Sequence, residues 1–190
     1  MWVFLSNKTD LLEPHPKRML HVAPEKALES KFKQIENLDY VSVDLHDRRA
    51  MVKMDITDLR YPDDSFDVIY CSHVLISVPN DRQAMREFNR VLKPNGFAVC
   101  IEAIRDEETL EDPTISSPAE QERIFGHPEH VRSYGLDFKD RLEEAGFSVK
   151  VFREREIIGE NDLLRLGVLN SHNKLGELIF FCKKQNRGYA

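Results

Sequence analysis

Cysteine, glycine and long apolar runs are all scarce in this 190-residue chain. Each of the three cysteines (Cys71, Cys100 and Cys182) lies in or at the end of an apolar run, and none forms a C-x-x-C motif. This pattern argues against a disulfide framework and indicates buried, reduced thiols in a cytoplasmic setting. No apolar run approaches the roughly 18 residues of a membrane span, and residues 2–5 are too few for the core of a signal peptide. We therefore expect no association with a membrane.

The chain also lacks an excess of positive charge. It has 27 Lys and Arg against 33 Asp and Glu, so its formal net charge is -6, with both signs spread along the sequence. This balance disfavours a large nucleic-acid-binding surface. No repeat, low-complexity segment or linker interrupts the sequence, and its length suits a single domain over residues 1–190.

Residues 53–101 read as a strand, a helix and a second strand. Residues 68–71 are apolar without alternation, as in a strand buried on both faces. Asn80 can cap a helix, and apolar residues then recur at helical spacing until a Pro-Asn-Gly sequence ends the pattern. Residues 97–101 are the next apolar run. This order favours a parallel strand pair joined by a right-handed crossover.

Three segments in this region carry a family resemblance. They are Asp55-Ile-Thr-Asp-Leu, Pro62-Asp-Asp-Ser-Phe-Asp-Val-Ile and Arg90-Val-Leu-Lys-Pro-Asn-Gly. In this order they resemble the class I S-adenosylmethionine (SAM)-dependent methyltransferases, most closely the "type 11" small-molecule group, and the likeness extends over residues 17–152. The resemblance implies SAM as the cofactor and a small-molecule acceptor, with a sugar or a cell-surface precursor as candidates.

The resemblance also implies an α/β fold: a doubly wound, Rossmann-like, mostly parallel seven-stranded sheet with a final antiparallel strand. Residues 1–16 show no clear periodicity, so the helix that precedes the first strand in the family is expected to be reduced or missing. Either residues 2–5 pack across the sheet, or one face stays partly bare. A bare face would favour a homodimer.

The first strand is expected at residues 18–23, with Pro24 at the first helical position. The family usually has an acidic residue and a glycine-rich loop here. In this sequence His21 stands in place of the acid, and Ala23, Pro24 and Glu25 stand in place of the glycines. The resemblance assigns these last three residues to cofactor binding. Glu25 would pair with the ammonium group of the cofactor, or it is only an acid of the first helical turn. For His21, a hydrogen bond to the backbone is the simpler expectation.

Two aspartates follow the next strands. Asp44 ends the second strand at about the 20-residue spacing at which nucleotide-binding folds place a carboxylate on the ribose hydroxyls. The alternative is a strand-end acid in solvent. By resemblance, Asp55 accepts a hydrogen bond from the adenine amine and Ile56 offers its backbone N–H to the ring. The alternative for Asp55 is a turn acid that caps Thr57 or Asp58.

The fourth strand ends at Ser72 and His73. Ligands of open parallel sheets lie at the carboxyl ends of the strands, so both residues are expected to contact the cofactor. His73 is also the candidate general base, because its ordinary pKa lies near 6.5. The alternative is a loop histidine bonded to backbone. Many relatives continue His-Val-Leu-Glu-His, whereas this chain has Ile76 and Ser77, which removes two polar groups from the pocket.

A long segment, residues 105–133, separates the fifth strand from the next helix and is expected to act as a lid that recognises substrate. Candidate substrate-binding residues are Glu102 at the end of the fifth strand and His130, Arg132 and Tyr134 in or beside the lid. Arg132 would grip a carboxylate or phosphate; the alternative for each is a solvated position. His127 and His130 alone are a weak metal motif, so no metal is expected.

Residues 163–169 are expected to form a covering helix or loop, and residues 177–182 the final strand. Two other functions remain open. A dinucleotide oxidoreductase would use Asp44 too, but no G-x-G-x-x-G follows the first strand. A non-catalytic or partner-dependent protein that keeps the SAM fold is the stronger alternative, because Ala23, Pro24, Ile76 and Ser77 all depart from the family pattern.

Overall fold

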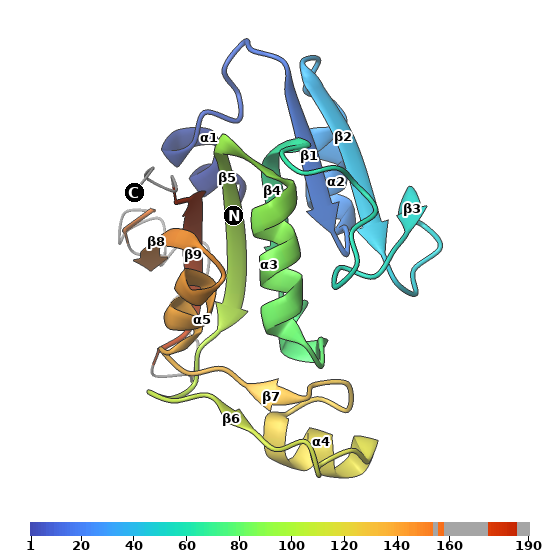
Figure 1. Ribbon diagram of the computed structural model, residues 1–190, viewed down its shortest axis with the longest axis vertical. Helices are drawn as coiled ribbons and strands as arrows, with labels where there is room; N and C mark the ends of the chain where they lie inside the picture. The colour runs from blue at the N-terminus through green and yellow to red at the C-terminus, as the bar shows by residue number, and fades with distance from the viewer. Residues whose placement is uncertain (154–155, 158–174, 186–190) are drawn as a thin grey trace.

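The computed structural model describes residues 1–153, 156–157 and 175–185. A seven-stranded sheet in the order β3-β2-β1-β4-β5-β9-β8 forms the centre of the molecule (Figure 1). Among these seven strands, β9 is the one that runs antiparallel to its neighbours, which are β5 and β8. The strands are β1 (Lys17–Val22), β2 (Leu38–Asp44), β3 (Val52–Lys53), β4 (Phe66–Ser72), β5 (Leu92–Ala103), β8 (Phe147–Arg153) and β9 (Glu177–Lys184). The predicted sheet is confirmed, and its strand order reverses between β1 and β4.

Helices cover both faces of this sheet (Figure 1). One apolar cluster lies under α3 (Asp81–Val91) and α5 (Phe138–Glu144). A second cluster lies under α1 (Trp2–Lys8) and α2 (Lys26–Phe32) on the opposite face. The central strands contribute side chains to both clusters, which is why residues 68–71 carry no polar alternation.

The N-terminal helix is reduced to the seven residues of α1. Its Phe4 and Leu5 are completely buried, and the Phe4 ring meets the Phe152 ring edge-on at 5.1 Å between centroids. Of the two expected arrangements, packing across the sheet is therefore confirmed. Because α1 covers this face, the expected reason for self-association does not apply.

Helix α3 begins as predicted, because the Asn80 side chain accepts a hydrogen bond from the backbone N–H of Gln83 at 3.2 Å. The expected start of the next strand at residue 97 is wrong. The helix ends at Val91, and β5 begins immediately at Leu92, which pairs with Phe66 before a register shift. The Pro-Asn-Gly sequence thus lies within an irregular strand. An added Cβ at Gly96 would come within 2.7 Å of the Asp67 carbonyl oxygen, so only glycine fits there.

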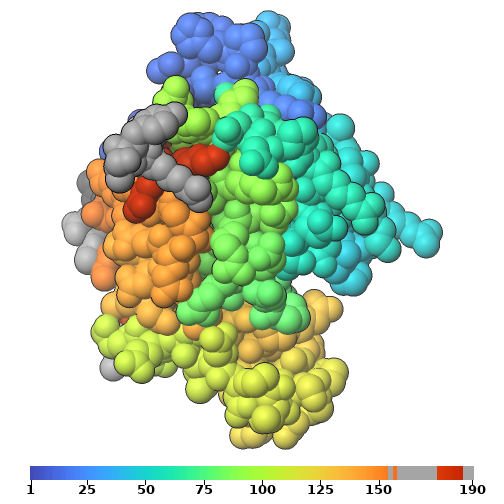
Figure 2. Space-filling model, in the orientation of Figure 1, coloured from blue at the N-terminus to red at the C-terminus, as the bar shows by residue number. Residues whose placement is uncertain are grey.

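Residues 105–133 form a small lobe beyond the carboxyl ends of the parallel strands (Figures 1 and 2). Strand β6 (Leu110–Glu111) pairs antiparallel with β7 (Arg132–Ser133), and α4 (Pro118–Phe125) lies between them in sequence. Helix α4 starts with the capping-box sequence Ser-Pro-Ala-Glu: the Ser117 hydroxyl accepts a hydrogen bond from the backbone N–H of Glu120 at 3.4 Å and donates one to the Glu120 carboxylate at 2.6 Å. The lobe therefore lies at the end of the sheet where a ligand is expected.

A short 3-10 turn, η1 (Leu75–Ser77), connects β4 to α3. No helix in the described part of the chain is long and apolar enough to cross a membrane. The expected covering segment at residues 163–169 lies outside the described residues.

Candidate functional site

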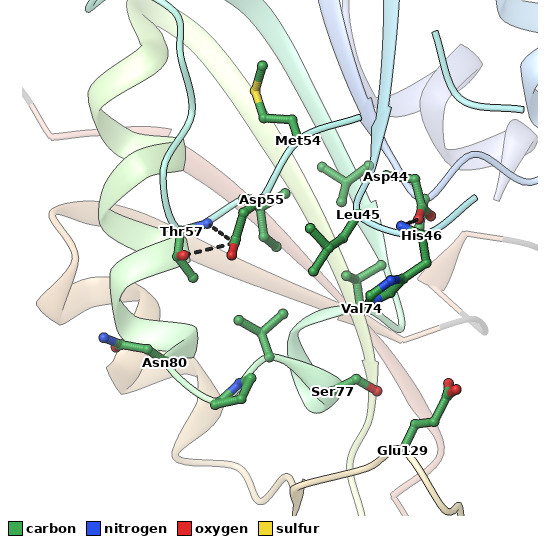
Figure 3. A pocket seen from close by; sticks show the side chains of 15 residues that line it. Asp44, Leu45, His46, Met54, Asp55, Thr57, Val74, Ser77, Asn80 and Glu129 are labelled. Atoms are coloured by element: carbon green, nitrogen blue, oxygen red, sulfur yellow. Dashed lines mark hydrogen bonds between the residues drawn. The ribbon is translucent and has the colours of Figure 1, made fainter. Parts of the chain in front are cut away.

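A cavity of about 510 Å³ opens at the carboxyl ends of β1, β2 and β3 (Figure 3). Ala23 lines it from the loop after β1, Asp44 from the end of β2, and Asp55 and Ile56 from the turn after β3. Its opposite wall is the segment from Val74 to Asn80, and Glu129 of the lobe closes one side. Four predicted cofactor-binding residues, distant in sequence, therefore share one cavity.

The loop after β1 turns without glycine. Ala23 has φ +48°, and His73, which follows β4, has φ +53°. Strands β1 and β4 are neighbours, so these two strained residues end adjacent strands at the point where the strand order reverses. Backbone strain of this kind concentrates at functional sites. The expected role of Pro24 as the first helical residue is wrong, because Glu25 is the N-cap and α2 starts at Lys26.

Glu25 is held by the histidine that replaces the family acid. His21 is completely buried; its Nε2 lies 2.7 Å from Glu25 Oε2, and its Nδ1 lies 2.9 Å from the Tyr40 hydroxyl. The expected backbone partner of His21 is thus wrong. Burial acts to raise the pKa of Glu25, but the hydrogen bonds of His21 and of the Ser72 hydroxyl outweigh it and lower that pKa. The result is an ionised carboxylate beside the loop after β1.

Asp44 presents a carboxylate to the cavity from the end of β2. Its Oδ1 accepts hydrogen bonds from the backbone N–H groups of His46 and Asp47 at 2.6 and 2.7 Å. These bonds fix the side chain, and Oδ2 accepts none from the described residues. Asp44 is therefore a positioned hydrogen-bond acceptor at the end of β2, in the cavity wall.

Asp55 lies on a different side of the cavity from Asp44 (Figure 3), and Ile56 lines the same cavity. Asp55 Oδ1 accepts hydrogen bonds from the backbone N–H and the hydroxyl of Thr57, both at 2.8 Å. The turn-capping alternative for Asp55 is thus confirmed, although the same turn places the residue at the cavity. Ile56 is buried and contributes an apolar surface.

His73 and Glu102 come together beside the cavity but are not among the residues that line it. His73 Nε2 lies 3.2 Å from Glu177 Oε1, and its Nδ1 lies 4.0 Å from Glu102 Oε2. The hydrogen bond to Glu177 is the main reason that the pKa of His73 is raised. Glu102 is only 1% exposed, and burial raises its pKa to about 8, so the solvated alternative for Glu102 is wrong.

The sequence did not identify Glu177 as a candidate site residue. Its side chain reaches His73 because β9 runs antiparallel to β5, which places Glu177 opposite Ala103. The acidic residue at the start of the final strand was the only signal for it in the sequence.

The structure brings neither Arg132 nor Tyr134 to the cavity. Arg132 is 3% exposed and donates hydrogen bonds to the carbonyl oxygens of Leu75, Val78 and Pro79 at 2.9, 2.6 and 2.9 Å. Its Nε binds Glu111 at 2.9 Å. The Tyr134 hydroxyl donates to Asp81 at 2.7 Å. Both side chains thus bind protein groups, and the expected grip of Arg132 on a substrate anion is replaced by an internal role.

His130 lies in the lobe, half-buried, with Nδ1 3.4 Å from the Phe125 carbonyl oxygen. Burial is the main reason that its pKa is lowered. The described residues contain no group of three or more side chains that could hold a metal ion. Glu129, one position earlier, lines the cavity instead and was missed. A lobe residue that reaches the cavity supports the placement of this segment over the site.

A family model described as "Methyltransferase domain" matches residues 17–100. The crystal structure of a SAM-dependent methyltransferase from Mesorhizobium loti has the same fold, with a TM-score of 0.65 and 14% identity over 90% of this chain and 93% of that one. The chain thus has the fold of a SAM-dependent methyltransferase.

Other methyltransferases extend the comparison. Methyltransferase GfsG of Streptomyces halstedii is 36% identical over 103 residues, which are 49% of this chain and 36% of that protein. The matched segments span about a third of the length of the first curated relatives. The Burkholderia thailandensis 1,6-didemethyltoxoflavin-N1-methyltransferase, solved with 1,6-didemethyltoxoflavin and S-adenosylhomocysteine (SAH) bound, matches with a TM-score of 0.61 at 13% identity and covers 93% of this chain and 79% of its own.

Proposed function

We propose that this protein is a class I methyltransferase that transfers a methyl group from SAM to a small-molecule acceptor. The observation that carries the proposal is the cavity at the reversal of strand order, with the fixed carboxylate of Asp44 at its wall. Open α/β sheets bind ligands at this position. The volume of about 510 Å³ lies within the range of small-molecule sites, about 300–1,000 Å³.

The residues in and beside this cavity suit SAM by their chemistry, although Glu25 and Ser72 are not among those that line it. Asp44 Oδ2 would accept hydrogen bonds from the ribose hydroxyls, which a carboxylate binds strongly. Asp55 and Ile56 would bind the adenine, and the ionised Glu25, with Ser72 beside it, would face the ammonium group near Ala23. Bound SAM supplies a methyl group made electrophilic by its sulfonium. The chain then has to align the acceptor and exclude water.

The acceptor proposed here is small, because the lobe reaches the cavity with Glu129 and the net charge of -6 disfavours nucleic acid. A sugar or cell-surface precursor is the acceptor class that the family resemblance suggests. The three cysteines are all buried and free, which supports a reducing, cytoplasmic location. A homodimer stays a prediction without structural support, because α1 covers the face expected to be bare.

Calorimetric titration of SAM and SAH tests the cofactor site. Asp44→Asn keeps Oδ1 as the acceptor for the turn amides but replaces the free Oδ2 by a donor. We expect this variant to bind SAH at least tenfold more weakly than the parent, which is about 1.4 kcal/mol. Asp58→Asn, an exposed turn acid outside the cavity lining, is the matched control and should bind like the parent. Absence of binding to the parent would favour the non-catalytic alternative.

A further inference from the structure

Three side chains that can carry positive charge come together in the lobe: Arg105, His127 and His130. Arg105 is the first residue of the lobe, and its backbone N–H donates a hydrogen bond to the Tyr134 carbonyl oxygen at 3.0 Å. His127 and His130 follow α4, and their ring centroids lie 4.8 Å apart. Arg105 and His127 are exposed and His130 is half-buried, so solvent reaches all three. We call these three residues the basic cluster.

The Arg105 guanidinium packs against the backbone at the end of α4. Its Nη2, Nη1 and Cζ atoms lie 2.7, 3.0 and 3.3 Å from the point that a Cβ of Gly126 would occupy. Asp106, Glu107 and Glu108 follow Arg105 directly in the sequence. The Arg105 side chain nevertheless makes no hydrogen bond or ion pair with the described part of the chain. Its N–H donors are therefore available to a ligand.

Both histidine rings have Nε2 left for a ligand. His127 Nδ1 accepts a hydrogen bond from the Glu129 backbone N–H at 3.2 Å, so the neutral ring carries its proton on Nε2. His130 Nδ1 lies 3.4 Å from the Phe125 carbonyl oxygen and donates to it. The His130 Nε2 atom becomes a second donor when the ring is protonated, and a bound anion favours the protonated ring.

The charges that act on His130 are positive. Burial is the largest cause of its lowered pKa, and the nearby groups that lower this pKa further are His127, Arg105 and His73. None of these three groups is an acid, although the chain has a net charge of -6. Positive groups held close together repel one another, and an anion between them would relieve this repulsion.

The basic cluster lies next to the cavity proposed for SAM. Glu129, which separates Pro128 from His130 in sequence, lines that cavity (Figure 3). His73 follows β4 and interacts electrostatically with His130 in the lobe. His73 also interacts electrostatically with Glu25, beside the loop after β1. A molecule bound beside His73 can therefore lie near the proposed cofactor at one end and the basic cluster at the other.

We propose that Arg105, His127 and His130 bind an anionic group of the methyl acceptor, a phosphate or a carboxylate, and that the acceptor is an acidic small molecule. This inference rests on the proposed methyl transfer and names the acceptor class for it. A guanidinium can bind either anion with two parallel hydrogen bonds, and the two imidazoles add donors beside it. Arg105 thus takes the role that the sequence suggested for Arg132, whose donors bind protein groups.

Binding of simple anions tests the basic cluster without turnover. Inorganic phosphate and acetate are titrated separately into the SAH complex at fixed pH, and sodium chloride keeps the ionic strength constant. Nuclear magnetic resonance follows the ring signals of His127 and His130. We expect phosphate or acetate to shift both signals saturably, and the anion that saturates at the lower concentration identifies the group. Absence of a saturable shift with either anion would overturn the proposal.

Variants of Arg105 test the role of its charge. Arg105→Gln removes the charge and the paired donors, whereas Arg105→Lys keeps a single point charge. We expect Arg105→Gln to bind the anion about tenfold more weakly than the parent, with Arg105→Lys between the two. Both should melt within about 2 °C of the parent, because the side chain is exposed.

Arg60→Gln is the matched control for these variants. The Arg60 side chain is 82% exposed and lies outside the cavity lining, so its loss should leave anion binding unchanged. Equal anion affinity in Arg105→Gln and in the parent would contradict the proposal.

Turnover identifies the acceptor class. A small-molecule filtrate of a cell extract is divided by anion exchange into a retained, acidic fraction and an unretained fraction, and each is incubated with methyl-labelled SAM. We expect a labelled product from the acidic fraction, with a phosphate or carboxylate group identified by mass spectrometry. Arg105→Gln should raise the apparent KM for this fraction about tenfold and keep kcat within about threefold, because it removes a binding contact.

The outcomes distinguish this inference from the proposed function. Labelled product from the unretained fraction alone would overturn the acidic acceptor and leave methyl transfer in place. Failure of the parent to bind SAH would instead refute the proposed function itself. If neither fraction yields product, the anion titration decides whether the basic cluster is a binding site.

Discussion

Replacing Arg132 by methionine should lower the free energy of unfolding by about 3–5 kcal/mol, the usual cost of breaking a buried ion pair. Methionine keeps the apolar contacts of the stem but removes every donor. The carbonyl oxygens of Val78 and Pro79 would lose the hydrogen bonds that Arg132 donates. The Leu75 carbonyl oxygen would keep only the hydrogen bond of the Val78 N–H, and the Glu111 carboxylate would keep only the hydrogen bonds of Arg141. Each charge-assisted hydrogen bond contributes roughly 1.5–3 kcal/mol. The expected loss of about 3–5 kcal/mol is smaller than the sum over these bonds, because the surrounding groups can partly rearrange or bind water.

Urea or thermal unfolding measures this loss. For a chain of this size, 1 kcal/mol shifts the melting temperature by about 2–4 °C, so the variant should melt about 6–20 °C lower. Lys139→Met is the matched control: Lys139 pairs with Glu143 at 2.7 Å, but both side chains are more than a third exposed. Such a surface pair contributes only about 0.3–0.5 kcal/mol.

The outcome separates two roles for Arg132. Val78 and Pro79 line the cavity, so the methionine variant should also bind SAH more weakly at temperatures where it is folded. A loss of less than about 1 kcal/mol, no larger than a surface pair can contribute, would refute the reasoning. It would mean that the three carbonyl groups are satisfied by water and that the Arg132 side chain is free for a substrate, as the sequence suggested.

Two further predictions concern the fold. Phe4→Ala should cost about 3–5 kcal/mol, because the ring is completely buried under the sheet; Leu12→Ala, nearly half exposed, is the control, and equal melting temperatures would contradict the role of α1. Hydrogen bonds from Arg141 lower the pKa of Glu111 to about 2. The stabilisation from the Glu111–Arg141 pair is present above pH 4.5 and is lost as pH falls toward 2. Glu111→Gln should therefore reduce the decrease in the free energy of unfolding over this pH range. The same decrease in Glu111→Gln and in the parent would contradict a stabilising role for this pair.

Local features of the fold could be predicted from the sequence. The cap at Asn80, the apolar face of α3 and the capping box at Ser117 each involve residues a few positions apart, so their spacing carries the information. The start of β5 at Leu92 could not be found this way. It depends on pairing with Phe66, and the Pro-Asn-Gly sequence that usually ends a helix here lies inside a strand.

The candidate site also combines features that the sequence predicts with features that it does not. The cavity contains three predicted residues that follow or end parallel strands: Ala23, Asp44 and Asp55. The carboxyl ends of parallel strands lie at one edge of the sheet, so it could be predicted that these residues line one cavity. The burial of Arg132 could not be predicted, because its partners lie in η1 and in the turn that follows it, more than 50 positions away. An arginine in a polar lobe reads as a surface group until the packing around it is known.

The position of β9 has a consequence for how the protein is made. This strand lies between β5 and β8, although β8 precedes it in sequence. While the chain emerges from the ribosome, β5 therefore keeps an open edge of unpaired N–H and C=O groups until residues 177–184 have been synthesised. An open edge of this kind is a template for pairing with other chains. A nascent chain paused before residue 177 would expose that edge and the apolar surface that Phe180 later covers, so its yield should depend on translation speed and on chaperones that bind extended, apolar segments.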